Sequence, residues 1–308
     1  MIQVQNLKKQ FGHFTAVKGI DFTVQPGEIL GFLGPNGAGK TTTMRMITGF
    51  LRPDGGQVKV FGHDIQAQPM PAKALLGYLP EGAPAYGDMT VLNFLDFIAQ
   101  VRGFKRNEKK RRIERVIGLL ELASVANRPV DTLSKGFKRR VGLAQAILHQ
   151  PPALILDEPT DGLDPNQKHQ VRELIRNLAQ DSLIIVSTHI LEEVTAVCGR
   201  ALILAQGRIV FDGSPAELMR QSRYHGAITL VFKQTPPQLD LGAIPGVAHA
   251  EIDSQDPARM TLLPKPGFPL FSSVQSWLVE NQVEVIEITI EQGRLDEVFR
   301  RLTTHNSQ

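Results

Sequence analysis

One run of eight residues has the types and spacing needed to bind phosphate groups. Gly34 to Thr41 read Gly-Pro-Asn-Gly-Ala-Gly-Lys-Thr, which satisfies the pattern G-x-x-x-x-G-K-[ST]. Its glycines let backbone N–H groups turn toward phosphate oxygens, while Lys40 supplies a point charge for the β- and γ-phosphates and Thr41 a hydroxyl ligand for Mg²⁺. The residues expected to contact the phosphates are Gly34, Pro35, Asn36, Gly37, Ala38, Gly39, Lys40, Thr41 and Thr42.

Two acidic residues, Asp157 and Glu158, directly follow the apolar run Leu154-Ile155-Leu156. An aspartate at the carboxyl end of a buried parallel strand lies where such sheets bind ligands, and it can hold Mg²⁺ through the water shell of the ion. Glu158 is then placed to polarise an attacking water. The alternative is that both acids cap the N-terminus of a helix. Their combination with a phosphate-binding loop favours hydrolysis of a nucleoside triphosphate.

Short apolar runs alternate with helical patterns, which predicts an α/β fold. Ile29–Leu33, Ala153–Leu156 and Leu183–Val186 are typical of strands buried on both faces of a parallel sheet. Between the last two, Asp164-Pro165 predicts the start of an amphipathic helix. The first 27 residues instead alternate with period two, as half-exposed antiparallel strands do. The predicted fold class is a P-loop α/β core with antiparallel N-terminal strands.

The chain is predicted to have two domains. Residues 88–149 carry helical patterns without strand signals, and we interpret them as a helical subdomain inserted into the core. A helix near Pro215–Met219 ends the first domain, so we expect a domain over 1–222 and a small α+β domain over 223–308. The strand-like runs expected in the second are Pro236-Pro237, Ala258–Leu263 and Val283–Ile290, with helices near Phe271–Glu280 and 293–302.

Composition and charge exclude several classes of protein. A single cysteine, Cys198, excludes an intramolecular disulfide framework and a cysteine-built zinc site. No apolar run approaches the roughly 18 residues of a spanning helix, and the N-terminus does not resemble a signal peptide, so we expect a cytoplasmic location. Residues 102–115 hold eight cations and two anions, and the rest of the chain, out of a total of +3, is net negative. One local basic patch does not indicate a nucleic-acid-binding surface.

A third motif lies between the phosphate-binding loop and Asp157. Ser134-Lys135-Gly136-Phe137, preceded by Leu133, is similar to the Leu-Ser-Gly-Gly-Gln signature of ATP-binding cassette (ABC) ATPases. The order of the motifs also matches, because Asp161-Gly162-Leu163-Asp164 follows Glu158, and His189 follows the strand at 183–186. On these motifs, residues 1 to about 220 resemble that family.

The resemblance implies a role for individual residues and two cofactors, ATP and Mg²⁺. Phe11 would stack on adenine, Glu158 would be the general base, and His189 would contact the γ-phosphate; Lys40 completes the catalytic set. Ser134 and Gly136 would bind the γ-phosphate of ATP held by an opposite subunit, so that a homodimer or a heterodimer with a paralogue encloses two nucleotides. Asp164, at the end of its loop, is also expected to contact nucleotide.

The sequence departs from the family pattern at two places. Lys135 and Phe137 replace the first glycine and the glutamine of the signature. Glu81, in the loop Tyr78-Leu79-Pro80-Glu81-Gly82, stands where the family carries a glutamine, and it is expected to accept from a magnesium-bound water. These features, and the segment Leu295–Phe299, are similar to the gliding-motility-associated exporter ATPases, a branch whose partners are simple six-helix permeases.

The resemblance implies the energy-coupling subunit of an exporter. ATP binding would close the dimer and hydrolysis reopen it, while the helical insert and the segment around Glu81–Met89 pass this motion to a separate permease at the inner face of the cell membrane. The alternative is a soluble ABC ATPase that acts on ribosomes or DNA, which the single cassette and the short insert disfavour. A third interpretation makes the C-terminal domain a ligand sensor; we prefer a dimer-stabilising or regulatory appendage.

Overall fold

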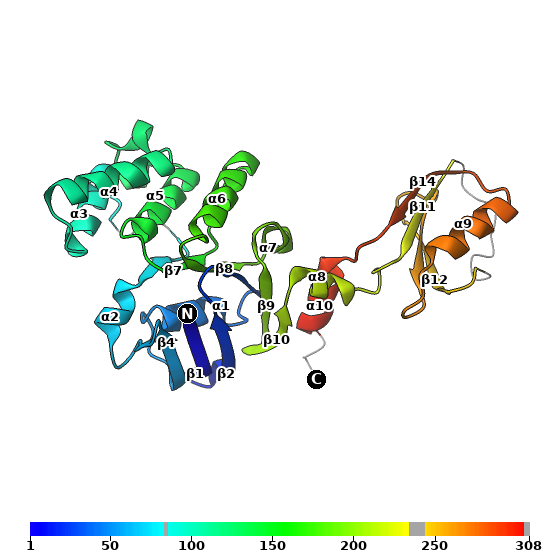
Figure 1. Cartoon of the computed structure of the whole chain (residues 1–308), viewed down its shortest axis with the longest axis horizontal. Helices are drawn as coiled ribbons and strands as arrows, with labels where there is room; N and C mark the ends of the chain where they lie inside the picture. The colour runs from blue at the N-terminus through cyan, green and yellow to red at the C-terminus, as the bar shows by residue number, and fades with distance from the viewer. Residues whose placement is uncertain (83–85, 234–243, 305–308) are drawn as a thin grey trace. The chain divides into compact units, whose positions relative to one another are not determined.

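The computed structural model describes residues 1–82, 86–233 and 244–304. It divides into two compact units, Met1–Gly213 and Ser214–Gln308, which are described separately (Figure 1). The expected strand-like run at Pro236-Pro237 lies outside the described residues.

An antiparallel sheet forms the first layer of the first unit. Its strand order is β2-β1-β4-β5, with β1 at Ile2–Phe11, β2 at Phe14–Val24, β4 at Gly55–Val60 and β5 at His63–Asp64. Alternate residues of β1 and β2, such as Ile2, Val4 and Val24, are buried, as period-two patterning requires. The expected antiparallel N-terminal strands are confirmed.

A second sheet of six strands carries the loops of interest. Its order is β10-β9-β3-β8-β7-β6, with parallel pairing from β9 through β6 and an antiparallel edge strand β10. The strands are β3 (Ile29–Leu33), β6 (Leu76–Leu79), β7 (Ala153–Asp157), β8 (Leu183–Thr188), β9 (Arg200–Ala205) and β10 (Arg208–Gly213). Strands β7 and β8 are buried at every position, which confirms the interpretation of their continuous apolar runs.

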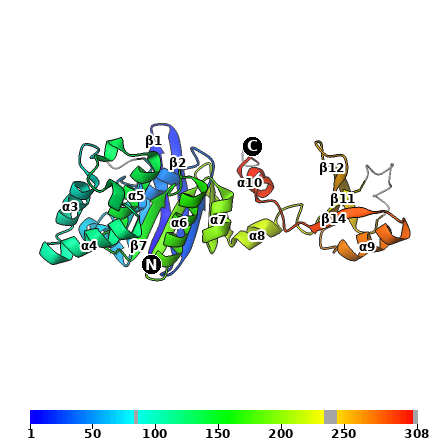
Figure 2. The same ribbon diagram turned by 90° about the horizontal axis from the view of Figure 1, so that it is seen from above.

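The helices of the first unit fall into two groups. Those around the sheets are α1 (Lys40–Ile47), α2 (Pro69–Ala74), α6 (Pro165–Leu178) and α7 (Leu191–Val197). The inserted ones are α3 (Val91–Val101), α4 (Arg106–Leu119) and α5 (Lys135–Ile147), with short 3₁₀ turns at Ala123–Val125 and Val130–Thr132. In both ribbon views α3 and α4 lie together at one end of this unit, beside α5 (Figures 1 and 2).

The second unit is an antiparallel sheet with one helix on a face. The strand order is β12-β13-β11-β14, and apolar side chains of the sheet pack against α9. The ribbon view shows α9 beside the strands (Figure 2). Its elements are α8 (Pro215–Arg220), β11 (Ile228–Phe232), β12 (Val247–Ile252), β13 (Arg259–Pro264), α9 (Phe271–Glu280), β14 (Val285–Ile290) and α10 (Leu295–Thr304).

The division between the units lies before α8, not after residue 222. Helix α8 packs against α10, and three hydrogen bonds reinforce this pairing. Ser222 Oγ donates to Glu297 Oε2 at 2.9 Å, the Arg301 guanidinium donates to the Gln221 carbonyl at 2.7 Å, and the Arg294 N–H donates to Ser222 Oγ at 3.1 Å. These contacts join two segments about 75 residues apart, a pairing that local sequence patterns do not predict.

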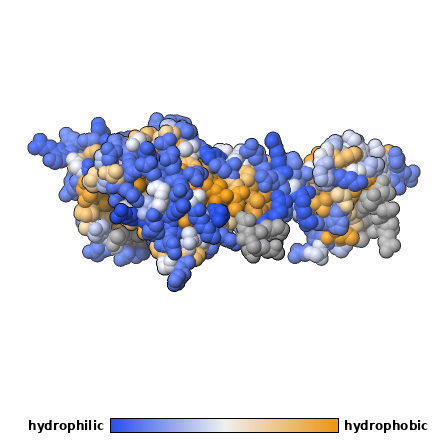
Figure 3. Space-filling view, turned by 90° about the horizontal axis from the view of Figure 1, so that it is seen from below, coloured by the Kyte–Doolittle hydropathy of each residue, from blue (hydrophilic) through white to orange (hydrophobic). Residues whose placement is uncertain are grey.

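The surface is mainly hydrophilic (Figure 3), and the core contains one cysteine. None of the helices in the described part of the chain is long and apolar enough to cross a bilayer, and the space-filling view shows apolar patches within a mainly hydrophilic surface (Figure 3). Cys198 is a buried free thiol next to Gly31, where an added Cβ would lie 3.1 Å from its sulfur. Burial raises the pKa of Cys198 to about 12.

Candidate functional site

The register of three neighbouring parallel strands brings the predicted catalytic loops together. Leu33, the last residue of β3, pairs with Thr188 of β8, and Asp157, the last residue of β7, pairs with Ser187 of β8. The carboxyl ends of the three strands are therefore level at one edge of the sheet. The phosphate-binding loop, the pair Asp157-Glu158 and His189 follow these ends directly, which is where α/β sheets bind ligands.

The phosphate-binding loop closes onto the side chain of Lys40. Lys40 begins α1 and is 8% exposed, and its Nζ donates to the Gly34 carbonyl at 2.6 Å and to the Pro35 carbonyl at 3.3 Å. Gly39 precedes it at φ 106°, and an added Cβ there would lie 2.5 Å from the Ala16 carbonyl oxygen. Glycine is therefore required at Gly39 both by the backbone and by the space.

Lys40 lies near three carboxylates that the sequence predicted as site residues. Burial lowers the pKa of Lys40, and the negative charges of Glu158, Asp157 and Glu81 oppose that shift, in this order of size. The charges that act on Lys40 thus include those of the predicted base and of both predicted metal-binding acids. Thr41 and Thr42, in the first turn of the same helix, are half-buried.

The surroundings of Asp157 fit a bound divalent cation. Asp157 is 1% exposed, and Ser187 Oγ donates a short hydrogen bond to its Oδ1. Its Oδ2 is buried without a hydrogen-bond partner among the described residues. A buried carboxylate oxygen without a donor is costly unless it binds something. Asp157, together with the Thr41 hydroxyl, therefore offers the hard oxygen ligands that Mg²⁺ prefers.

Glu158 adopts an uncommon backbone conformation that directs its side chain to His189. Its φ is 52°, a left-handed value that costs a non-glycine residue about 1–3 kcal/mol. The Glu158 N–H donates to the carbonyl and the Oγ of Ser187 at 3.1 and 3.2 Å. Its Oε1 lies 3.0 Å from His189 Nδ1, whose N–H it can accept. Burial raises the pKa of the Glu158 carboxyl, while His189 and Lys40 oppose this shift.

The signature segment forms the start of α5. Ser134 is the N-cap, and its Oγ accepts from the Phe137 N–H at 3.4 Å. An added Cβ at Gly136 would lie 2.6 Å from Gln167 Oε1, so a larger residue would displace that amide. Lys135 Nζ forms a 2.8 Å ion pair with Asp161. Lys135, one of the two residues that depart from the signature, thus contacts the loop after Glu158.

The other predicted contacts lie around these loops. Phe11, at the end of β1, is 48% exposed, and Lys9 Nζ lies 5.4 Å from the centroid of its ring. Asp164 caps α6, because its side chain accepts from the Gln167 N–H at 2.9 Å. Glu81 is exposed and lines a cavity of about 90 Å³ together with Glu158 and Lys135. Within the described chain, no hydrogen bond links Phe11, Ser134 or Asp164 to Lys40.

Sequence reasoning missed several residues that support the site. Ser187 contacts Asp157 and Glu158, and Glu193, 5% exposed, accepts from Thr160 Oγ1 at 2.5 Å and from Thr188 Oγ1 at 3.1 Å. A polar residue at the end of a buried apolar run, the signal that identified Asp157, applies equally to Ser187. The role of Glu193 depends on a helix folding back onto the strand end, which no local pattern indicates.

Comparison with known proteins identifies the family. Residues 17–161 match the family model described as ABC transporter. The chain is 36% identical over 234 residues to the uncharacterized ABC transporter ATP-binding protein YxlF of Bacillus subtilis, covering 76% of this chain and 77% of that one. It is 35% identical over 255 residues to the Nod factor export ATP-binding protein I of Paraburkholderia xenovorans, covering 82% of this chain and 84% of the relative.

Solved structures agree with these relatives. A structure titled as the ATP binding subunit of an ABC transporter matches with a TM-score of 0.67 and 29% identity, over 72% of this chain and 92% of that one. A dimeric ATP-binding cassette, MJ0796 bound to ADP and Pi, shares the fold with a TM-score of 0.65 at 22% identity, over 70% of this chain and 99% of that one. The chain therefore belongs to the ATP-binding subunits of ABC transporters, and it is a P-loop ATPase of that family.

Proposed function

We propose that this subunit hydrolyses ATP between two paired copies to drive export through a separate membrane permease. The observation that carries the proposal is the contact between Glu158 and His189 beside Lys40, at the level carboxyl ends of β3, β7 and β8. In this proposal Glu158 is the base, His189 orients it and Lys40 is the phosphate-binding cation, all three following strand ends at the same edge of the sheet.

Lys40, Thr41 and Asp157 bind the triphosphate and its metal in this proposal. Lys40 Nζ exchanges its hydrogen bonds to the Gly34 and Pro35 carbonyls for bonds to phosphate oxygens. Because Lys40 is already buried, binding the phosphates removes little further water from the ammonium group. Asp157 Oδ2 and the Thr41 hydroxyl would hold Mg²⁺, and the Glu81 carboxylate would accept from a water bound to it. Bound Mg²⁺ neutralises part of the charge on the phosphates.

Glu158 takes the proton from the attacking water. Its side chain is 14% exposed, so solvent competes little for the carboxylate, and the His189 ring next to it fixes the carboxylate's orientation. His189 is 55% exposed, which leaves its second ring nitrogen accessible to the γ-phosphate.

The signature segment serves the nucleotide of the opposite copy. Among the described residues, Ser134 and Gly136 form no hydrogen bond with Lys40 of their own chain, and the N-terminus of α5 gives their backbone a partial positive charge suited to a phosphate. The dimeric relative bound to ADP and Pi shares this fold. A single chain then lacks half of each site, and two chains enclose two nucleotides.

An exposed groove offers a docking surface for the permease. It has a volume of about 510 Å³ and lies between α2, β6 and the inserted helix α3. Three apolar side chains that line the groove are largely exposed, namely Phe50 (75%), Met70 (77%) and Val101 (69%). Burying such side chains is energetically favourable, so an exposed apolar patch indicates an interaction surface. An apolar helix of a membrane partner would cover them. Docking there would hold the subunit at the inner face of the membrane.

Relatives support export as the direction of transport. They include the Nod factor export protein of Paraburkholderia xenovorans and a linearmycin resistance ATP-binding protein of Bacillus subtilis, 36% identical over 219 residues. The relatives named here are transporter subunits, which disfavours action on ribosomes or DNA. Membership of the gliding-motility-associated branch, with its six-helix permease, stays a prediction.

The decisive experiment traps the dimer. We expect Glu158→Gln to bind ATP, to lower kcat roughly 100-fold or more because the base is lost, and to elute as a dimer with ATP on size-exclusion chromatography. Lys40→Ala is the matched control, and it should bind no ATP and stay monomeric. Hydrolysis by Glu158→Gln at the parental rate would show that the base is another residue, and an ATP-loaded monomer would contradict the paired site.

A further inference from the structure

Arg139 is a buried cation that the proposed mechanism does not use. It lies in α5, five residues after the Ser134 cap, and it is 6% exposed. Removing a guanidinium from water is unfavourable unless its N–H groups are satisfied. Nη1 and Nη2 donate to backbone carbonyls from two different loops of the site, whereas Nε is buried without a partner in the described chain.

One nitrogen of the guanidinium binds the carboxyl end of β7. Nη2 donates to the carbonyls of Asp157 and Glu158, the second at 2.5 Å. These two carbonyls belong to the peptide groups on either side of the Glu158 Cα. Because Ser187 also accepts from the Glu158 N–H, both peptide planes that set the φ and ψ of Glu158 are held.

The other nitrogen binds the loop that carries Glu81. Nη1 donates to the Pro80 carbonyl at 2.8 Å and to the Gly82 carbonyl at 3.3 Å, on the two sides of Glu81. A planar guanidinium presents its donors in a fixed fork, so the two loops cannot move independently while both sets of bonds are made.

We propose that Arg139 is a positioning residue that holds the Glu158 backbone in its left-handed conformation and links it to the Glu81 loop. Arg139 acts through Glu158, so this inference rests on the proposed role of that residue as the base. Movement of the Glu81 loop, which adjoins the groove lined by Pro80, is then transmitted to the catalytic carboxylate through one side chain.

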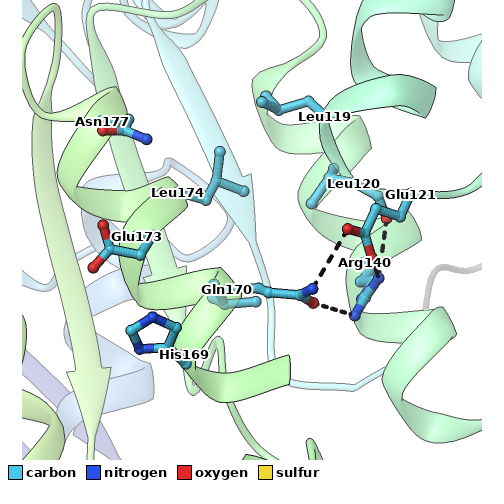
Figure 4. Close-up of a pocket in the computed structure, with 10 residues that line it drawn as sticks. Leu119, Leu120, Glu121, Arg140, His169, Gln170, Glu173, Leu174 and Asn177 are labelled. Atoms are coloured by element: carbon cyan, nitrogen blue, oxygen red, sulfur yellow. Dashed lines mark hydrogen bonds and ion pairs between the residues drawn. The ribbon is translucent and has the colours of Figure 1, made fainter. Parts of the chain in front are cut away.

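The next residue of the helix provides a matched control. Arg140 is 8% exposed, and its guanidinium binds Glu121 at 2.9 Å and Gln170 at 2.8 Å (Figure 4). These partners line a separate pocket of about 260 Å³ between the end of α4 and α6, which contains none of the predicted site residues. Loss of either arginine removes a buried cation, but only Arg139 contacts the Glu158 backbone.

The test compares Arg139→Gln, Arg139→Lys and Arg140→Gln in the full chain. We expect Arg139→Gln to lower kcat about 10- to 100-fold while the KM for ATP and the affinity for a non-hydrolysable ATP analogue change less than about threefold. A lysine can bind one carbonyl but not span two loops, so Arg139→Lys should recover part of kcat. Arg140→Gln should keep kcat within about threefold of the parent, at a temperature where each variant is folded.

A double variant separates a failure of this inference from a failure of the proposed function. If Arg139 acts through Glu158, adding Arg139→Gln to Glu158→Gln should lower the residual single-turnover rate less than about threefold. A full further 10- to 100-fold loss, or equal kcat values for Arg139→Gln and Arg140→Gln, would overturn the inference. A Glu158→Gln variant with parental activity would instead show that Glu158 is not the base.

If Arg139→Gln does not fold, the Arg139→Lys variant alone decides the test. A parental kcat in Arg139→Lys would then overturn the inference.

Discussion

Glu81 lies in the loop that Arg139 binds, and its carboxylate is one of three whose charges act on Lys40. Its charge opposes the burial-induced lowering of the Lys40 pKa, and its neighbours Pro80 and Gly82 are bound by Arg139. The Glu81 side chain is exposed and forms no side-chain hydrogen bond within the described chain, so in the proposed function it can accept from a metal-bound water.

We therefore expect Glu81→Gln to change the dependence of hydrolysis on Mg²⁺ and to leave ATP affinity within about threefold. An amide still accepts from a metal-bound water, but it removes one negative charge near the cation. The measurement is kcat against Mg²⁺ concentration, with the half-saturating concentration rising in the variant. A complete loss of ATP binding would contradict this role.

Among the individual site residues, those that belong to contiguous motifs could be predicted from the sequence. Lys40 ends the loop that follows β3, Asp157 is the last residue of β7 and Glu158 comes next, so their placement was predictable once the strands were recognised. Arg139 and Ser187 could not be assigned in the same way. Their partners are backbone groups of loops distant in sequence, and those contacts exist only after the sheet has formed.

The packing of α5 on β6 includes a histidine that is held neutral. His149 follows the end of α5, and its Nε2 lies 3.0 Å from the Leu76 carbonyl of β6, to which the neutral ring donates. Its Nδ1 is buried without a partner in the described chain, and burial, helped by the charges of Arg102 and Arg112, lowers the pKa of His149 to about 4. Protonation would add a buried positive charge that Arg102 and Arg112 repel.

We expect this contact to weaken in acid. The pKa of His149 is lower in the folded chain than its ordinary 6.5, so the unfolded chain binds more protons, and stability falls as the pH drops from about 6.5 toward 4. Between pH 7.5 and 5 the loss should be about 1–2 kcal/mol. The measurement is urea unfolding of the parent and of His149→Gln, which keeps an N–H donor but does not titrate. Parallel curves of unfolding free energy against pH would refute it.

Elements with strong local signals were predictable, and those without were not. The strands at Ile29–Leu33, Ala153–Asp157 and Leu183–Thr188 are continuous apolar runs, and α9 was expected at the residues where it lies. The sequence patterns did not predict strands β11 and β12. Strand β12 exposes Ala248, His249 and Ile252, so its pattern reflects pairing with β13 more than its own periodicity.

The two-unit organisation of the whole molecule has a consequence for truncation. The expected phosphate, base and signature residues all lie within Met1–Gly213, whereas α8 belongs with α10 in the second unit. Leu218 of α8 is 1% exposed, and a chain that ended at residue 222 would lack α10, the helix that packs against α8. Exposing a leucine costs about 1.5–3 kcal/mol and favours aggregation.

We expect a chain that ends at Gly213 to fold and to bind ATP with an affinity close to that of the full chain. A chain that ends after residue 222 should bind more of a hydrophobic dye and remain less soluble, because α8 lacks its partner helix. Dye fluorescence, solubility and ATP binding of the two fragments are the measurements. The reverse order of solubility would place the boundary after α8.

The buried thiol of Cys198 makes the natural chain convenient for spectroscopy. It is the chain's one cysteine, and a pKa of about 12 leaves almost no thiolate to react with a maleimide at neutral pH. A cysteine introduced at an exposed position such as Arg111 can therefore carry a fluorophore without prior removal of the native one. Energy transfer between donor- and acceptor-labelled chains would then show in real time whether ATP brings two chains together and whether hydrolysis separates them.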